Sequence, residues 1–161
     1  MNIEIICTGK FKERYWQDAA AEYSKRLSRF CKLTITELPE SRLPDKAGPA
    51  EEQQVIENES RAVLKKLESM PQSFVIALAV NGKSLSSEQL AEKIGELGLS
   101  GKSRVVFVIG GSLGLSEELL RACDMRLSFS AMTFPHQMMR VILLEQIYRA
   151  FKINAGESYH K

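Results

Sequence analysis

"RVVFVI", residues 104–109, is a continuous apolar run, and "FVIALA", residues 74–79, is a second one. Strands of a parallel sheet with helices on both faces are apolar at every position, whereas half-exposed strands alternate between apolar and polar side chains. Both runs therefore predict strands inside a parallel sheet. Further strands are expected at 2–8 ("NIEIICT"), at 32–38 ("KLTITEL") and near 126–130.

Helical patterns separate these strands. Apolar side chains recur at helical spacing over 13–30, about 51–67 and 86–97, in a short segment from Ser116, and in a long one after Pro135. The strand–helix order, repeated about five times, predicts one α/β domain over residues 1–161. We expect a mainly parallel sheet flanked by helices.

Composition narrows the class of protein. The chain of 161 residues is 44% hydrophobic and 26% charged, which is typical of a folded domain rather than a disordered one. Its net charge of +2 is too small to indicate nucleic-acid binding by itself, although basic side chains gather between Lys10 and Lys32. No pattern of a zinc site, disulfide framework, signal peptide or membrane span is present. We therefore expect a cytoplasmic protein with free thiols and no metal.

Three loops follow expected strands and should meet at one edge of the sheet, where open parallel sheets bind their ligands. These loops are "AVNGKS", "IGGSLGLSEE" and "SAMTFPH". The glycines suggest a dinucleotide site, but their spacing is not GxGxxG, and Glu117 and Glu118 in the next helix would repel a pyrophosphate. The loop is either a tight turn or a site for a ligand without phosphates, such as adenosine carrying a cationic group. The third loop either clasps an adenine through its main chain or is a plain connector.

The last helix places Arg140 at the end of a face with Leu143, Leu144, Ile147 and Phe151. Such an arginine snorkels over its apolar neighbours, forms an interfacial ion pair, or serves a site together with His136 one turn earlier. The helix is apolar around most of its circumference, and this predicts a partner subunit.

Together, "FVIGGSLGL", "LSFSAMTFPHQMMRVILLEQIYRA" and the terminal "GESYHK" resemble the RlmH (YbeA-like) family of SPOUT methyltransferases, and the similarity runs over the whole chain. The resemblance implies an α/β fold with a C-terminal trefoil knot, a homodimer and S-adenosylmethionine as cofactor. The implied activity is methylation of N3 of a pseudouridine in the intersubunit stem-loop of 23S ribosomal RNA, on assembled ribosomes.

The resemblance also implies site residues. Contacts to S-adenosylmethionine are expected from Leu78, Gly110, Phe129, Ser130, Ala131, Met132, Thr133 and Phe134. We expect His136 to act as base or orienter, and Arg140 to hold a phosphate or stabilise the imide anion. The tail Tyr159, His160 and Lys161 is suited to stacking on RNA, unless it is a frayed terminus. Two alternatives remain open: a non-catalytic ribosome-binding or assembly factor, and another nucleotide-using enzyme.

Overall fold

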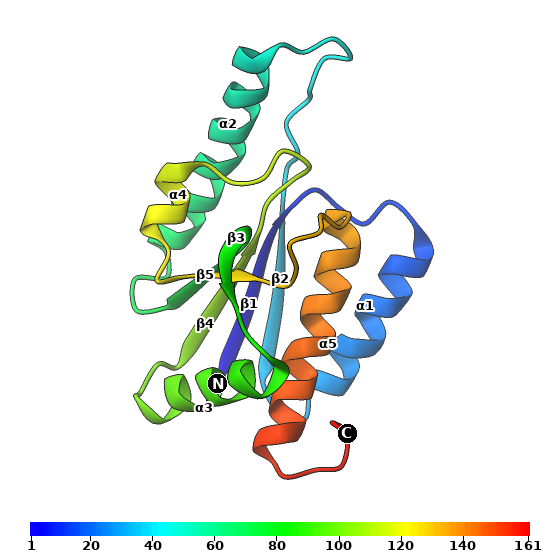
Figure 1. The fold of residues 1–161 in the computed structure, drawn as a ribbon, viewed down its shortest axis with the longest axis vertical. Coiled ribbons are helices and arrows are strands. Elements are labelled where there is room, and N and C mark those ends of the chain that lie inside the picture. The colour runs from blue at the N-terminus through cyan, green and yellow to red at the C-terminus, as the bar shows by residue number, and fades with distance from the viewer.

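Five strands form one sheet in the order β2-β1-β4-β3-β5 in the computed structural model, which describes residues 1–161 (Figure 1). Every strand pair is parallel, so the expectation of a mainly parallel sheet is confirmed in a stronger form. The strands are β1 (Asn2–Thr8), β2 (Lys32–Leu38), β3 (Phe74–Ser84), β4 (Arg104–Ile109) and β5 (Met125–Ser128). The helices are α1 (Arg14–Leu27), α2 (Pro49–Glu68), α3 (Ser87–Leu99), α4 (Glu117–Ala122) and α5 (His136–Asn154).

The apolar core lies on both faces of the sheet, as the unbroken apolar runs predicted. On β4, Val105, Phe107 and Ile109 pack into a core shared with α1, α3 and α5. The intervening Val106 and Val108 pack on the opposite face, in a smaller core with residues of α2 and α4. Because successive side chains point to opposite faces, a strand covered twice must be apolar at every position.

Helix α5 lies between α1 and α3 on one face of the sheet (Figure 1). Its Arg140, Leu143, Leu144, Ile147 and Ala150 are buried, and Asn154 donates a hydrogen bond to the Ala91 carbonyl of α3. No residue of α5 before Asn154 is fully exposed. Two flanking helices in the same chain therefore account for much of the apolar circumference from which a partner subunit was inferred.

The pairing of β3 with the edge strand β5 is interrupted. Leu127 lies opposite Leu78 and again opposite Lys83, so residues 79–82 leave the ladder. Gly82 allows this approach, because a Cβ atom there would lie 2.7 Å from the Arg126 carbonyl carbon and 2.8 Å from the Leu127 backbone. Two of the displaced residues, Ala79 and Val80, line the cavity described below.

The remaining differences from the sequence expectations are at element ends. Helix α1 ends at Leu27 rather than near residue 30, β3 continues to Ser84, and β5 ends at Ser128. None of the helices has the length and apolar content that crossing a bilayer requires.

Candidate functional site

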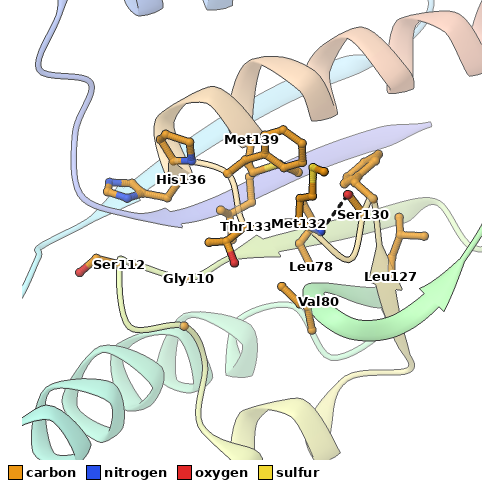
Figure 2. Close-up of a pocket in the computed structure, with 17 residues that line it drawn as sticks. Leu78, Val80, Gly110, Ser112, Leu127, Ser130, Met132, Thr133, His136 and Met139 are labelled. Atoms are coloured by element: carbon orange, nitrogen blue, oxygen red, sulfur yellow. Dashed lines mark hydrogen bonds between the residues drawn. The ribbon is translucent and has the colours of Figure 1, made fainter.

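A cavity of about 490 Å³ lies where the carboxyl ends of β3, β4 and β5 meet (Figure 2). We call it the strand-end pocket, and its volume is in the usual range for small-molecule sites. It is lined by Leu78, Ala79, Val80, Ile109, Gly110, Gly111, Ser112, Gly114, Leu127, Phe129, Ser130, Met132, Thr133, Phe134, Pro135, His136 and Met139. The three loops selected from the sequence therefore converge on one site, as predicted from the common edge of parallel strand ends.

The glycine loop after β4 is tightly folded. Gly114 has a φ of +88°, which side-chain-bearing residues rarely adopt, and its amide donates to the Gly111 carbonyl at 3.1 Å. A Cβ atom at Gly110 would lie 2.8 Å from the Gly114 carbonyl oxygen. The loop thus closes back on itself and presents backbone, rather than side chains, to the pocket.

The loop between β5 and α5 is held by its own serines. The Ser128 hydroxyl donates to the Ser130 carbonyl at 3.1 Å. The Met132 amide donates to the Ser130 hydroxyl at 2.9 Å (Figure 2). The amides of Ala131, Thr133 and Phe134 make no hydrogen bond within the chain. Main-chain donors in this loop are therefore free to bind a ligand.

No Asp, Glu, Lys or Arg side chain lines the strand-end pocket. Its one titratable group is His136, whose pKa is lowered below the ordinary value by burial, against the opposing effect of Glu40. The imidazole is therefore uncharged at neutral pH, and its Nε2 atom is buried without a hydrogen-bond partner. Figure 2 shows His136 and Ser112 at the same end of the pocket. A pocket without cations fits a ligand that carries no phosphate groups.

Arg140 does not line the pocket, although it lies one turn after His136. Its side chain is 0% exposed and forms an ion pair with Glu37 at 2.8 Å. It also donates to the Gly9 carbonyl at 3.0 Å, and its guanidinium stands 4.2 Å from the centre of the Phe11 ring. Complete burial excludes the snorkelling alternative, and the charge links α5 to the ends of β1 and β2.

The C-terminal tail is packed against its own chain. The Tyr159 ring lies edge-on to Tyr148 at 4.9 Å, and its hydroxyl donates to Glu145 at 3.2 Å. His160 pairs with Glu88 of α3 at 2.7 Å. Glu145 lies nine residues after His136, or about 14 Å along a helix. The tail is therefore ordered but does not reach the pocket of the same chain.

Eight of the thirteen residues singled out from the sequence line the strand-end pocket, and five do not. Leu78, Gly110, Phe129, Ser130, Met132, Thr133, Phe134 and His136 line the pocket. Ala131 belongs to the same loop but not to the lining, and Arg140, Tyr159, His160 and Lys161 are also outside the lining. Val80, Ser112 and Met139 also line the pocket; they lie within the segments selected from the sequence but were not singled out as site residues.

The free thiols are not candidates for chemistry at neutral pH. Cys7, Cys31 and Cys123 form no disulfide, and burial raises the pKa of each thiol to about 11. Since the thiolate is the reactive form, these cysteines are packing residues.

Comparison with known proteins places this architecture in one family. The model of a family described as "Predicted SPOUT methyltransferase" matches residues 1–160. The chain belongs to the SPOUT methyltransferase family. Among its curated relatives, the ribosomal RNA large subunit methyltransferase H proteins of Clostridium novyi, Bifidobacterium adolescentis and Clostridium kluyveri are 59%, 56% and 50% identical over the full length of both chains. Within SPOUT methyltransferases the chain is thus a member of the RlmH family, as its C-terminal motifs suggested.

Solved structures share the SPOUT fold at much lower identity. A probable methyltransferase from Bordetella pertussis Tohama I superposes with a TM-score of 0.56 at 17% identity, covering 92% of this chain and 95% of that chain. A methylase family protein from Neisseria gonorrhoeae gives the same TM-score and identity, with 99% and 86% coverage. At this identity the likeness shows the fold alone.

Proposed function

We propose that this protein transfers the methyl group of S-adenosylmethionine to N3 of a pseudouridine in the intersubunit stem-loop of 23S ribosomal RNA, on assembled ribosomes in the cytoplasm. The full-length relatives named ribosomal RNA large subunit methyltransferase H support the substrate class. The observation that carries the proposal is the uncharged strand-end pocket. An adenosine with a sulfonium group fits it, whereas a dinucleotide would bring phosphates without cations to meet them.

The pocket offers suitable partners for each part of S-adenosylmethionine. Free amides in the 129–134 loop suit the adenine, and Leu78 and Phe129 offer apolar contact. Gly110 allows the Gly114 backbone to approach closely, and this tight turn presents its backbone to the cofactor. When bound, the cofactor supplies a methyl group on a sulfonium, which is already a strong electrophile. The protein must then align the target base and remove one imide proton.

Two residues of the first turn of α5 support this chemistry. His136 is uncharged, lines the pocket and can accept or orient a proton. Arg140 acts as a positioning residue, because its bonds to Glu37 and to the Gly9 carbonyl fix the segment after β1 against α5. Because Arg140 is fully buried, we propose this positioning role in place of direct contact with the RNA.

Methyl transfer from labelled cofactor to ribosomes that lack the modification tests the proposal, with the modified base mapped afterwards. We expect label at N3 of one pseudouridine in 23S RNA. Ribosome binding that is equally tight with and without cofactor, and with no methyl transfer, would instead identify a non-catalytic ribosome-binding factor.

Calorimetry tests the cofactor separately. S-adenosylmethionine or its demethylated product should bind without added metal. Thr133→Pro should weaken binding at least tenfold, because proline removes a free amide and restrains the loop. A strong NAD signal, or a requirement for zinc or magnesium, would support another nucleotide-using enzyme.

The assembly and the knot extend the proposal. A homodimer is supported by half-buried apolar side chains of α5, such as Met138 and Ile142, that still reach the surface. In a dimer, the tail Tyr159–Lys161 would bind RNA at the seam between copies, since it does not reach its own pocket. A C-terminal trefoil knot is proposed from membership of the RlmH family alone. Tracing an experimental density map through residues 129–135 tests the knot.

A further inference from the structure

A second cavity, of about 340 Å³, adjoins the strand-end pocket and differs from it in charge. We call it the charged cavity, and its polar lining consists of Lys12, Glu40, Ser41, Arg42, Glu59 and Ser112. Ser112 lines both cavities, so the two spaces meet at the glycine loop. The first cavity has no charged side chain, whereas the second has four. Two adjoining cavities, one uncharged and one charged, are suited to two different ligands.

Glu59 is the buried acid of the charged cavity. It projects from α2 and is 5% exposed, and its Oε1 atom accepts a hydrogen bond from the Ser41 amide at 2.8 Å. Its Oε2 atom makes no hydrogen bond within the chain. A Cβ atom at Gly111 would lie 2.7 Å from that oxygen, and Gly111 lines the strand-end pocket. The free carboxylate oxygen therefore lies at the boundary between the cavities.

Two cations accompany Glu59. Arg42 forms no ion pair, and Lys12 has only a loose one with Glu40 at 3.8 Å, with 65% of the lysine side chain exposed. The Lys12 amide is anchored by Gln137 of α5 at 2.9 Å. Exposed cations at the rim of a cavity with a buried acid are suited to a ligand that carries a phosphate outside and a hydrogen-bond donor inside.

We propose that the charged cavity receives the target nucleotide, with Lys12 and Arg42 binding its phosphates and Glu59 accepting the imide N3–H. This inference rests on the proposed function, since it names the place of the substrate base. An imide presents an N–H between two carbonyls, and the cavity offers an acceptor, Glu59, with a hydroxyl donor at Ser112. In the proton-transfer step the N3–H bond breaks, its proton joins the Glu59 carboxylate, and the electron pair stays on N3. His136 then orients the target base and does not take the proton.

The surroundings of Glu59 suit a proton acceptor. Burial raises the pKa of its carboxyl above the ordinary value, the hydrogen bond from Ser41 lowers it, and Glu40 raises it again. Lys12 and Arg42 are the other charged groups of the cavity, and both are at its rim. A carboxylate with a raised pKa is closer to the operating pH, which makes it a better general base.

The first test compares Glu59→Gln with Glu57→Gln, a change at an exposed site on the same helix. Single-turnover methyl transfer to ribosomes is followed from pH 6.5 to 9 at saturating cofactor. Glu59→Gln should lower the rate at pH 7 by about 10²–10⁴-fold, and the deficit should shrink as the pH rises, since ionisation of the imide in solution replaces the base. Glu57→Gln should behave as wild type. A wild-type rate for Glu59→Gln, or a deficit equal at every pH, would overturn the assignment.

The second test needs neither cofactor nor turnover. Co-sedimentation with ribosomes is measured at several salt concentrations for Lys12→Ala, Arg42→Ala and the control Lys102→Ala, whose exposed side chain lies at the opposite end of β4. Each rim substitution should weaken binding and reduce the slope of log K against log salt by about 0.9. Unchanged slopes for both rim variants would refute the phosphate contacts.

The two arms separate the inference from the proposed function. A wild-type protein that binds ribosomes with rim-dependent salt slopes but transfers no methyl group would defeat the proposed function and leave the cavity as a nucleotide site. A wild-type protein that methylates ribosomes, with Glu59→Gln equally active, would defeat the Glu59 assignment alone.

Discussion

At the scale of single residues, Arg140 shows how a charge can be fully buried and still satisfied. Its guanidinium has Glu37, the Gly9 carbonyl and the Phe11 ring as neighbours, and only its Nε atom lacks a partner. Removing one member of a buried ion pair leaves the other charge buried without a partner. The resulting loss of folding free energy is larger than the net stability that the intact pair contributes.

Arg140→Ala should therefore reduce the free energy of unfolding by about 3 kcal/mol, the lower end of the range for buried pairs, because the Glu37 side chain keeps 30% exposure. Urea denaturation measures this. Arg26→Ala is the control, since its pair with Glu22 is exposed and should contribute less than about 1 kcal/mol. A loss below about 1 kcal/mol for Arg140→Ala would contradict the positioning role.

Glu59 has the opposite stability signature. Its folded pKa is raised above the unfolded value, so its favourable contribution is present below the ordinary pKa of 4.5 and is lost as the pH rises through the folded pKa. Glu59→Gln should therefore make the protein more stable than wild type at pH 7 and change it less at pH 4. Thermal unfolding at both pH values measures this. A Glu59→Gln variant that is less stable at pH 7 than at pH 4, relative to wild type, would show that the carboxylate serves packing.

The sequence predicted which loops meet at one edge of the sheet, because parallel strands bring their carboxyl ends together. The individual residues Leu78, Gly110 and Thr133 came from the resemblance to the RlmH family. Glu59 was not found, because a glutamate in a helix rich in acidic residues looks solvent-exposed until α2 is packed against the glycine loop. The partner of Arg140 was also hidden, since Glu37 is 103 residues away in sequence.

At the scale of elements, the glycine turn between β4 and α4 connects both cavities. Its shape depends on backbone packed against backbone, because a Cβ atom at Gly110 would lie 2.8 Å from the Gly114 carbonyl oxygen and 2.9 Å from its carbon. Neither atom can move away as a flexible side chain would.

Gly110→Ala should therefore distort the turn and weaken binding of S-adenosylmethionine at least tenfold in calorimetry. Gly95→Ala is the matched control, because that glycine lies within α3 and its Cβ would only contact the Asn154 side chain, at 3.4 Å. The control should bind cofactor normally and gain up to about 1 kcal/mol of stability from helix propensity. Normal cofactor binding by Gly110→Ala would show that the turn is not part of the cofactor site.

Helix α5 marks the limit of periodicity arguments. The sequence correctly predicted a long helix with apolar side chains on most sides, and the face of Arg140 is buried as expected. Periodicity reports how much of a helix is covered but not by what. Here α1, α3 and the sheet provide much of the cover, so a partner subunit needs evidence of its own.

At the scale of the whole molecule, light scattering measures the mass of the particle in solution and so tests for a partner subunit. At micromolar protein we expect twice the chain mass of 18.1 kDa. A standard interface would bury roughly 1,600 Å² in total. A monomer that remains fully active would exclude both the dimer and a site shared between copies.

Deleting Tyr159–Lys161 tests the tail in the same assembly. The deletion should leave cofactor binding intact, because these residues do not line the strand-end pocket, and should lower methyl transfer to ribosomes. Loss of one base stacked on an aromatic ring should weaken the free energy of RNA binding by about 1–3 kcal/mol. Unchanged transfer would show that the contacts with Glu145 and Glu88 are purely structural.

The distribution of the pocket along the chain has a consequence for biosynthesis. Its walls come from residues 78–80, 109–114 and 127–139 of a chain of 161 residues, and its last segment is fixed by α5, which ends at Asn154. Chains fold as they emerge, with N-terminal parts first. A nascent chain from which α5 has not yet emerged lacks part of the pocket wall. Because this wall lies late in the chain, we expect a ligand of the strand-end pocket to bind only near the end of synthesis.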